Sequence, residues 1–272
     1  MSNLGRRVVT ALILVPLFLA ALWLLSGWSF AVFLGLILLL AAWEWGGLCA
    51  LEPVQRWFWL LACSLLAAGL YLLQWLWLTA AVGALFWLFA IAAVIVFPRG
   101  QAMWATRSAR LSAGVLVLIP AWAALLLLQG MPHGPWLVLW TMLMVWGSDI
   151  GGYFIGRAWG RRKLAPAVSP GKTVEGLLGG VGAALLLSLG MVVAVGLPGS
   201  ALIGVLVITL LVVAAAVFGD LFESLIKRVA GVKDSGSLLP GHGGVLDRID
   251  AVLAAAPVAA LLLHQFGAEM LA

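Results

Sequence analysis

Charged side chains are scarce in this sequence, and their scarcity excludes most classes of soluble protein. Only 9% of the 272 residues are Asp, Glu, Lys or Arg, whereas 65% are hydrophobic and the mean hydropathy is +1.18. A soluble globular domain carries about 25% charged residues. The composition therefore predicts an all-α integral membrane protein with several spans.

Cysteine and histidine are also scarce, with two and three residues respectively. Two cysteines without metal-ligand spacing exclude a disulfide framework, so we predict that Cys49 and Cys63 are packing residues. His133 and His264 fall at the ends of apolar runs and are expected to be structural. His242 lies among glycines and is a candidate for phosphate contact or proton transfer.

Nine apolar runs are long enough to cross a bilayer. They cover residues 8–25, 28–48, 57–73, 75–97, 111–128, 136–155, 175–196, 201–224 and 249–266. The first run lacks an A-x-A site and is too long for a signal peptide, so we expect a retained span. Two junctions, at Ser26-Gly27 and Gln74, leave almost no loop between neighbouring spans.

With nine spans, all 15 Lys and Arg residues fall on one side of the membrane. The positive-inside rule then predicts a cytoplasmic N-terminus and a non-cytoplasmic C-terminus. We expect about five scaffold helices in residues 1–130 and a catalytic region in 131–272. The catalytic region has cytoplasmic loops at 156–174 and 227–248.

Half of the ten Asp and Glu residues lie between 218 and 250. Each charge near lipid costs about 2.5 kcal/mol or more, so this concentration indicates chemistry. Helical spacing places Asp220, Glu223, Ser224 and Lys227 on one stripe, which must face the protein interior. The alternative is a structural ladder in which Lys227 pairs with Asp220 and Glu223.

A glycine-rich loop follows and ends in two further carboxylates. Gly241, Gly243 and Gly244 allow positive φ and close approach of the backbone to a ligand. Asp247 and Asp250 share one face where the last span begins. Their alternative role is capping and complementing the helix dipole, which contributes about 0.3–1 kcal/mol each.

Carboxylates without histidine suit a hard cation such as Mg²⁺. Asp220 and Asp247 are the natural pair to hold it, with Glu223 and Asp250 as further candidates. Basic side chains beside them suit phosphate oxygens; these are Lys227, Arg228, Lys233 and Arg248. Together these groups are typical of phosphoryl or nucleotidyl transfer.

A second polar block runs from Ser148 to Glu175. Asp149 lies deep in the sixth span, and the glycines at 152, 156 and 160 predict close helix packing. The SPGKT segment is no P-loop, because no G-x-x-x-x-G-K precedes it. We expect Ser169, Lys172 and Thr173 to form an anion-binding turn that opens the seventh span. We expect the basic residues at 161–163 to help set the membrane orientation and to attract lipid headgroups.

The C-terminal pattern resembles the signature of phosphatidate cytidylyltransferases, also called CDP-diacylglycerol synthases. The matching residues are Ser224, Lys227, Arg228, Lys233, Asp234, Pro240, His242, Gly243, Gly244, Asp247, Arg248 and Asp250. The block from Asp149 to Gly176 is also similar, so the resemblance covers the C-terminal half. Gly152 departs from the Ala of many relatives.

The resemblance implies a nine-helix homodimer of the cell inner membrane that binds no nucleic acid. It implies transfer of the cytidylyl group of CTP to phosphatidate on the cytoplasmic side, with Mg²⁺ and a possible second cation. Asp220 and Asp247 would bind the metal, while Lys227 and Arg228 would act with Asp149 in catalysis. The expected substrate-binding residues are Ser169, Lys172, Thr173, Ser224, Lys233, His242, Gly243, Gly244 and Arg248.

Two other classes share parts of this pattern. An ion-coupled transporter would also keep Asp149 and Asp220 in the membrane, but the inverted repeats of such proteins are absent. Another lipid-modifying transferase, such as a polyprenol kinase or an isoprenoid-ether cytidylyltransferase, would use the same cations and carboxylates. Only the substrates separate that class from the phosphatidate cytidylyltransferases.

Overall fold

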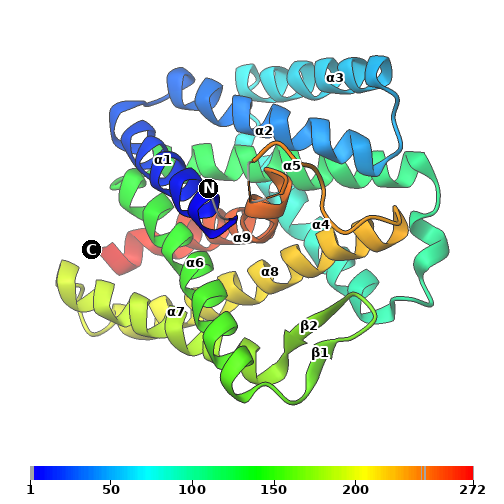
Figure 1. Cartoon of the computed structure of the whole chain (residues 1–272). Helices are drawn as coiled ribbons and strands as arrows, with labels where there is room; N and C mark the ends of the chain where they lie inside the picture. The colour runs from blue at the N-terminus through cyan, green and yellow to red at the C-terminus, as the bar shows by residue number, and fades with distance from the viewer. Residues whose placement is uncertain (1–2, 240, 242, 272) are drawn as a thin grey trace.

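The computed structural model describes the backbone of residues 3–239, 241 and 243–271, with side chains at 10, 12–239, 241 and 243–265. In these ranges nine long helices follow one another (Figure 1). They are α1 (Asn3–Leu24), α2 (Trp28–Leu48), α3 (Pro53–Leu72), α4 (Leu76–Val96), α5 (Arg107–Gly130), α6 (Gly134–Trp159), α7 (Val174–Val195), α8 (Ala201–Val229) and α9 (Leu246–Leu271). A 3₁₀ turn, η1 (Gln101–Trp104), precedes α5.

The helices α2 to α8 are each long and apolar enough to cross a membrane, which confirms an all-α membrane protein. The described apolar part of α1, Leu12–Leu24, is shorter, and α9 begins with charged residues. Nine spans therefore stay a prediction. The helix α8 continues to Val229, beyond the expected end at 224, because its polar last turns pack inside the protein rather than meeting lipid.

A short antiparallel hairpin, β1 (Lys163–Ala165) and β2 (Ser169–Thr173), joins α6 to α7 and was not expected. The predicted turn at 169–173 is instead the second strand. Thr173 still caps α7, since its hydroxyl accepts a hydrogen bond of 3.1 Å from the Gly176 N–H. The local role of Thr173 is thus helix capping.

Glycines allow the tight connections and the close packing that the sequence predicted. The junctions between α1 and α2 and between α3 and α4 turn at positive φ, +53° at Gly27 and +59° at Gln74. Between α6 and α7, a Cβ on Gly156 would lie 3.4 Å from the Cα of Gly176. The backbones of α6 and α7 therefore approach closely along this seam, as expected.

The last helix, α9, lies at the centre of the fold and packs against α8, α5 and α4 (Figure 1). Its middle is a run of buried small residues, Ala254, Ala255 and Ala256. Trp87 of α4 donates a hydrogen bond of 3.2 Å to the Leu253 carbonyl. These contacts hold the charged first turn of α9 against several helices at once.

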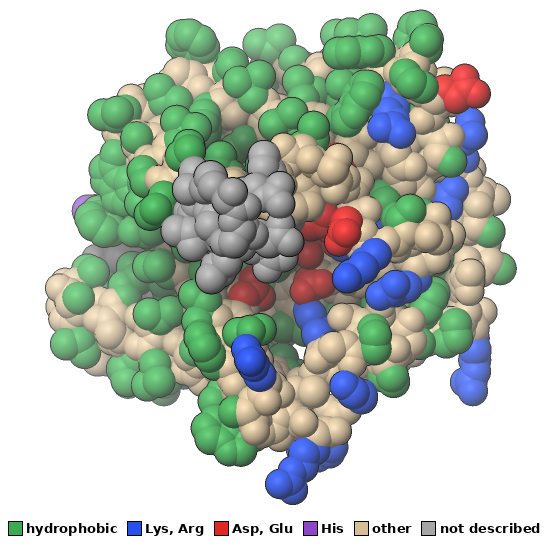
Figure 2. Space-filling model, in the orientation of Figure 1, with side chains coloured by type: hydrophobic (Ala, Val, Ile, Leu, Met, Phe, Trp, Pro, Cys, Tyr) green, Lys and Arg blue, Asp and Glu red, His purple; other side chains and the backbone are tan. Residues whose placement is uncertain are grey.

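Charged side chains gather at one end of the bundle. In Figure 1, α2, α3, α5 and α8 run roughly across the page, and in Figure 2 the Lys and Arg side chains lie over the right side and the lower centre of the same view. Arg107 donates to the Ala50 carbonyl at 3.0 Å, and Arg228 donates to the Val168 carbonyl at 3.1 Å. The connections that the sequence placed on one side thus meet in space.

The α6–α7 seam leaves no room at Gly180, where a Cβ would lie 2.5 Å from the Ser148 carbonyl oxygen. We expect Gly180→Ala to destabilise the protein by about 1–3 kcal/mol, because overpacking forces the two helices apart. Gly182 is the matched control on the same helix, since a Cβ there meets nothing within 4 Å. Gly182→Ala should leave the melting temperature in detergent unchanged or raise it; equal melting of both variants would contradict the close seam.

Candidate active site

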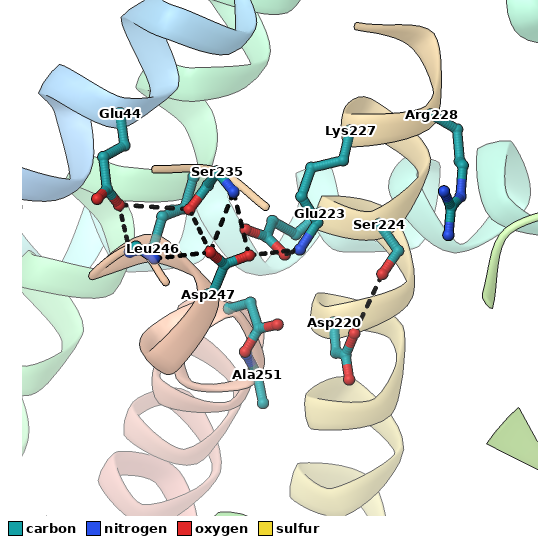
Figure 3. A network of polar contacts seen from close by, with 12 residues as sticks. Glu44, Asp220, Glu223, Ser224, Lys227, Arg228, Ser235, Leu246, Asp247 and Ala251 are labelled. Atoms are coloured by element: carbon teal, nitrogen blue, oxygen red, sulfur yellow. Dashed lines mark hydrogen bonds and ion pairs between the residues drawn. The ribbon is translucent and has the colours of Figure 1, made fainter. Parts of the chain in front are cut away.

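Carboxylates from helices far apart in the sequence meet in one polar region. Figure 2 shows acidic side chains in a hollow near the centre of this face, with basic ones beside them. Figure 3 shows that the acidic groups come from α2, α8 and the start of α9. The region divides into a tightly bonded network and an open cavity.

Lys227 is the centre of the network (Figure 3). Its ammonium group pairs with Glu223 and lies 2.6 Å from Oδ1 of Asp247. The Lys227 side chain is only 12% exposed, and the two carboxylates are 2% and 8% exposed. The sequence suggested a structural ladder in which Lys227 pairs with Asp220 and Glu223. The pair with Glu223 is present. Among the described side chains no ion pair joins Lys227 to Asp220.

Asp247 accepts hydrogen bonds from the loop that precedes its helix as well as from Lys227. The donors are Ser235 N–H at 3.0 Å, the Ser235 hydroxyl at 2.9 Å and Gly244 N–H at 2.9 Å. Gly241 and Gly243 have positive φ, as predicted, while close approach of their backbone to a ligand stays a prediction. The carboxylate of Asp247 thus organises the loop around the start of α9.

Glu44 of α2 completes this network, and the sequence reading did not single it out. Its carboxylate accepts a hydrogen bond of 2.8 Å from the Leu246 N–H and lies 3.3 Å from the Ser235 hydroxyl (Figure 3). One signal could have identified Glu44: it is the single charged residue in the apolar run 28–48. The rule that drew attention to Asp149 applies equally to it.

Asp220 lies outside the network and pairs with a residue of the hairpin. Oδ2 of Asp220 is 2.6 Å from Nζ of Lys172, and the side chains of the pair are 29% and 27% exposed. The other oxygen, Oδ1, accepts a long hydrogen bond of 3.3 Å from the Ser224 hydroxyl. This pair is therefore accessible where the Lys227 pairs are not.

A cavity of about 390 Å³ opens beside this pair between α6, α7, α8 and the hairpin. Its volume lies within the range of small-molecule sites. Its polar side chains come from Ser148, Asp149, Tyr153, Arg157, Lys172, Thr173 and Asp220. Glycines from the α6–α7 seam form part of its wall, so backbone lines the cavity where larger side chains would fill it.

A second cavity of about 390 Å³ lies between α1, α2, α5, α6 and α9. Most of its lining is apolar, including Ile37, Leu125 and Trp146. Its polar lining comes from Asp149, Asp247, Arg248 and Asp250, together with Thr10. Asp149 lines both cavities, so the polar and the largely apolar cavity adjoin at this carboxylate.

The remaining predicted site residues are spread over the same region. Arg228 points away from the network toward the hairpin (Figure 3), while Lys233 is exposed on the loop. Ser169 begins β2 and does not line the first cavity. A Cβ on Gly244 would lie 2.5 Å from the Glu44 carboxylate, so this glycine serves close packing. His242 lies outside the described residues.

The polar region contains carboxylates that could bind Mg²⁺. No three His, Cys, Asp or Glu side chains among those described stand close enough to form a metal site by themselves. Mg²⁺ is commonly bound by one or two carboxylates together with substrate phosphates. Asp149 and Asp220 line one cavity and offer oxygen ligands of this kind, so the residues present fit the ion. The oxygens of Asp247 are already bonded to Lys227, Ser235 and Gly244.

The two cysteines take no part in this chemistry. Both are free and buried, as the sequence predicted. Burial raises the pKa of the Cys49 thiol to about 11, so it stays protonated at neutral pH. A neutral buried thiol behaves as a small apolar side chain.

Comparison with known proteins gives a consistent result over nearly the whole chain. Residues 5–266 match the model of the cytidylyltransferase family. The phosphatidate cytidylyltransferase of Pseudomonas aeruginosa is 44% identical over 266 residues, covering 97% of this chain and 98% of that protein. The proteins of the same name from Haemophilus influenzae and Brucella suis are each 38% identical. These matches cover 93% and 98% of this chain and 96% and 94% of the relatives.

We expect Lys227→Met to lower the free energy of unfolding by about 3–5 kcal/mol, because it leaves two buried carboxylates without their cation. Melting in detergent measures this. Lys233→Met is the matched control, since it removes an exposed ammonium group from the neighbouring loop. A melting temperature of Lys227→Met equal to that of Lys233→Met would show that the network adds no stability.

Proposed function

The chain belongs to the cytidylyltransferase family, and we propose that it transfers the cytidylyl group of CTP to phosphatidate. The products are CDP-diacylglycerol and pyrophosphate. The names of the relatives, phosphatidate cytidylyltransferases, support this choice of substrates. The observation that carries the proposal is the open cavity in which Asp149, Lys172 and Asp220 meet.

The strengths of the ion pairs of Lys172 and Lys227 indicate which of the two lysines contacts substrate. The ion pair of Lys172 and Asp220 is partly exposed, so solvent screens it and it contributes less than a buried pair, and substrate phosphate can replace it. The pairs of Lys227 are buried, and breaking them leaves uncompensated charge. Lys172 therefore binds phosphate of CTP, while Lys227 holds the network together. The sequence had predicted phosphate contacts for both Lys172 and Lys227, without separating their roles.

The two adjoining cavities suit a reaction between a water-soluble and a lipid substrate. The polar cavity accommodates the nucleotide, and the largely apolar cavity accommodates the glycerol and acyl part of the lipid. Arg248 lines the polar end of the second cavity, where the lipid phosphate would lie. Since Asp149 lines both cavities, the two substrates would meet beside this residue.

The chemistry needs positioning more than acid–base catalysis. A phosphate oxygen of phosphatidate attacks the α-phosphorus of CTP in line, an oxygen–phosphorus bond forms, and the bond to the β-phosphate oxygen breaks to release pyrophosphate. The second pKa of a phosphate monoester is about 6, so the nucleophile is already ionised at neutral pH. Lys172 and Arg248 bind and orient the two phosphates, which lowers the entropic part of the barrier.

Mg²⁺ would be held by Asp220 and Asp149, which line the polar cavity. The sequence also suggested Asp247, Glu223 and Asp250, but Asp247 and Glu223 are bonded to Lys227 and Asp250 lines the second cavity. When bound, Mg²⁺ would neutralise charge on the triphosphate. Ser224 orients Asp220 through its hydroxyl. The network around Asp247 keeps the start of α9 beside the cavity.

The orientation and assembly of the protein are part of the proposal. The gathering of Lys and Arg at one end of the bundle supports nine spans with that end in the cytoplasm of a bacterial inner membrane. There the site would receive CTP from water and phosphatidate from the bilayer. Labelling of a cysteine at the exposed position 237 only from outside the cell would contradict this orientation.

Family resemblance further suggests a homodimer. The mass of the protein in nanodiscs would test this.

The purified protein should release pyrophosphate from CTP and Mg²⁺ when phosphatidate is added, and release almost none without it. The lipid product should be CDP-diacylglycerol by mass spectrometry. A polyprenol kinase would instead convert CTP to CDP when polyprenol is added, and an isoprenoid-ether cytidylyltransferase would release pyrophosphate with an ether lipid. Either result, with no pyrophosphate released on addition of phosphatidate, would refute the proposed substrate.

Asp220→Asn should lower turnover by more than about tenfold, equivalent to roughly 1.4 kcal/mol, while the protein still inserts and melts normally. The amide keeps the shape of the side chain but removes the charge that would pair with Mg²⁺. Glu52→Gln is the matched control, because Glu52 is an exposed carboxylate outside the cavities and the motifs. Turnover of Asp220→Asn above a tenth of wild type would remove Asp220 from the metal site.

A further inference from the structure

Glu44 lies on α2, in the half of the chain that carries none of the recognised motifs. Its side chain is only 3% exposed. One carboxylate oxygen, Oε2, accepts from the Leu246 N–H at 2.8 Å and lies 3.3 Å from the Ser235 hydroxyl. Both partners are about 200 residues away in the sequence, so this contact forms only in the folded protein.

The loop closes around Glu44 from two sides. A Cβ on Gly236 would lie 2.7 Å from the carboxylate carbon of Glu44, and one on Gly244 would lie 2.5 Å from Oε2. Larger residues at these positions would push the carboxylate away. The fit therefore joins one acidic side chain on α2 to two glycines of the loop.

The partners of Glu44 also orient Asp247. Ser235 donates to Asp247 through both its N–H and its hydroxyl, and Leu246 is the first residue of α9 (Figure 3). A hydrogen bond to a charged group is stronger than one between neutral groups, and a buried N–H left without a partner destabilises the fold. Loss of Glu44 would thus release the loop and the first turn of α9 together.

We propose that Glu44 is a positioning residue for the cytidylyl transfer reaction. It fixes Ser235, Gly244 and the first turn of α9, so that Asp247 and Arg248 face the cavities. The expected effect on turnover rests on the proposed function. The effect of Glu44 on the position of the loop does not depend on it. Glu44 contacts neither substrate and acts through Ser235 and Leu246.

Three variants separate positioning from general stability. Glu44→Ala removes the acceptor, whereas Glu44→Gln keeps a carbonyl oxygen for Leu246 and adds an N–H₂ donor for Ser235. Trp45→Phe is the control on the same helix, because it deletes a hydrogen bond of 2.8 Å to the Arg110 carbonyl and does not contact the loop. For each variant the measurements are melting temperature, kcat and KM for both substrates, and hydrogen exchange of the segment 235–246.

We expect Glu44→Ala to lower kcat at least about tenfold, equivalent to roughly 1.4 kcal/mol, and to speed exchange at Leu246. The KM for CTP should change less than about twofold, because Lys172 and Asp220 are untouched. Glu44→Gln should keep most of the turnover and the slow exchange. Trp45→Phe should lower the melting temperature with turnover and loop exchange unchanged.

Wild-type kcat and exchange in Glu44→Ala would overturn the proposal, as would an equal loss of kcat in Trp45→Phe. A Glu44→Gln variant as impaired as Glu44→Ala would also overturn it, because hydrogen bonding would not be the cause. Hydrogen exchange needs no turnover. If the wild-type protein makes no CDP-diacylglycerol, the proposed function fails while exchange at Leu246 still tests the role of Glu44.

Discussion

The buried ammonium group of Lys227 is the contact on which the arrangement of the site depends. Charges removed from water are tolerated only when paired and hydrogen-bonded. Glu223 and Asp247 meet this requirement from two different helices, so α8 and α9 must keep their ends together. Asp247 then binds the loop, and the loop reaches Glu44 on α2. One desolvated cation thus links the C-terminal motif to the N-terminal half of the chain.

Much of the fold could be predicted because a helix that crosses a bilayer needs about 20 apolar residues in a row. Each of the nine runs in the sequence corresponds to one of the nine helices in the described residues. The ends of the helices were less predictable. The helix α8 continues past its apolar run because polar side chains in its last turns face the protein interior. The hairpin was missed because strands of three and five residues are too short for a periodic pattern.

The site was predicted in composition but not in its internal division. Helical spacing correctly placed Glu223 and Lys227 within reach of each other on α8. It could not show that Lys227 is buried while Lys172 is accessible, because exposure depends on the neighbouring helices. Glu44 was missed for a related reason, since its partners lie about 200 residues away. Motifs report residues along the chain, whereas desolvation is a property of the packed bundle.

The central claim is that the accessible lysine acts on substrate and the buried lysine on structure. Measuring turnover and melting temperature of Lys172→Met in detergent tests it most directly. Turnover should fall by more than about tenfold, and the melting temperature should stay within roughly 2 °C of wild type, because an exposed pair contributes little stability. Wild-type turnover in Lys172→Met, or a fall in melting temperature as large as that of Lys227→Met, would contradict the account.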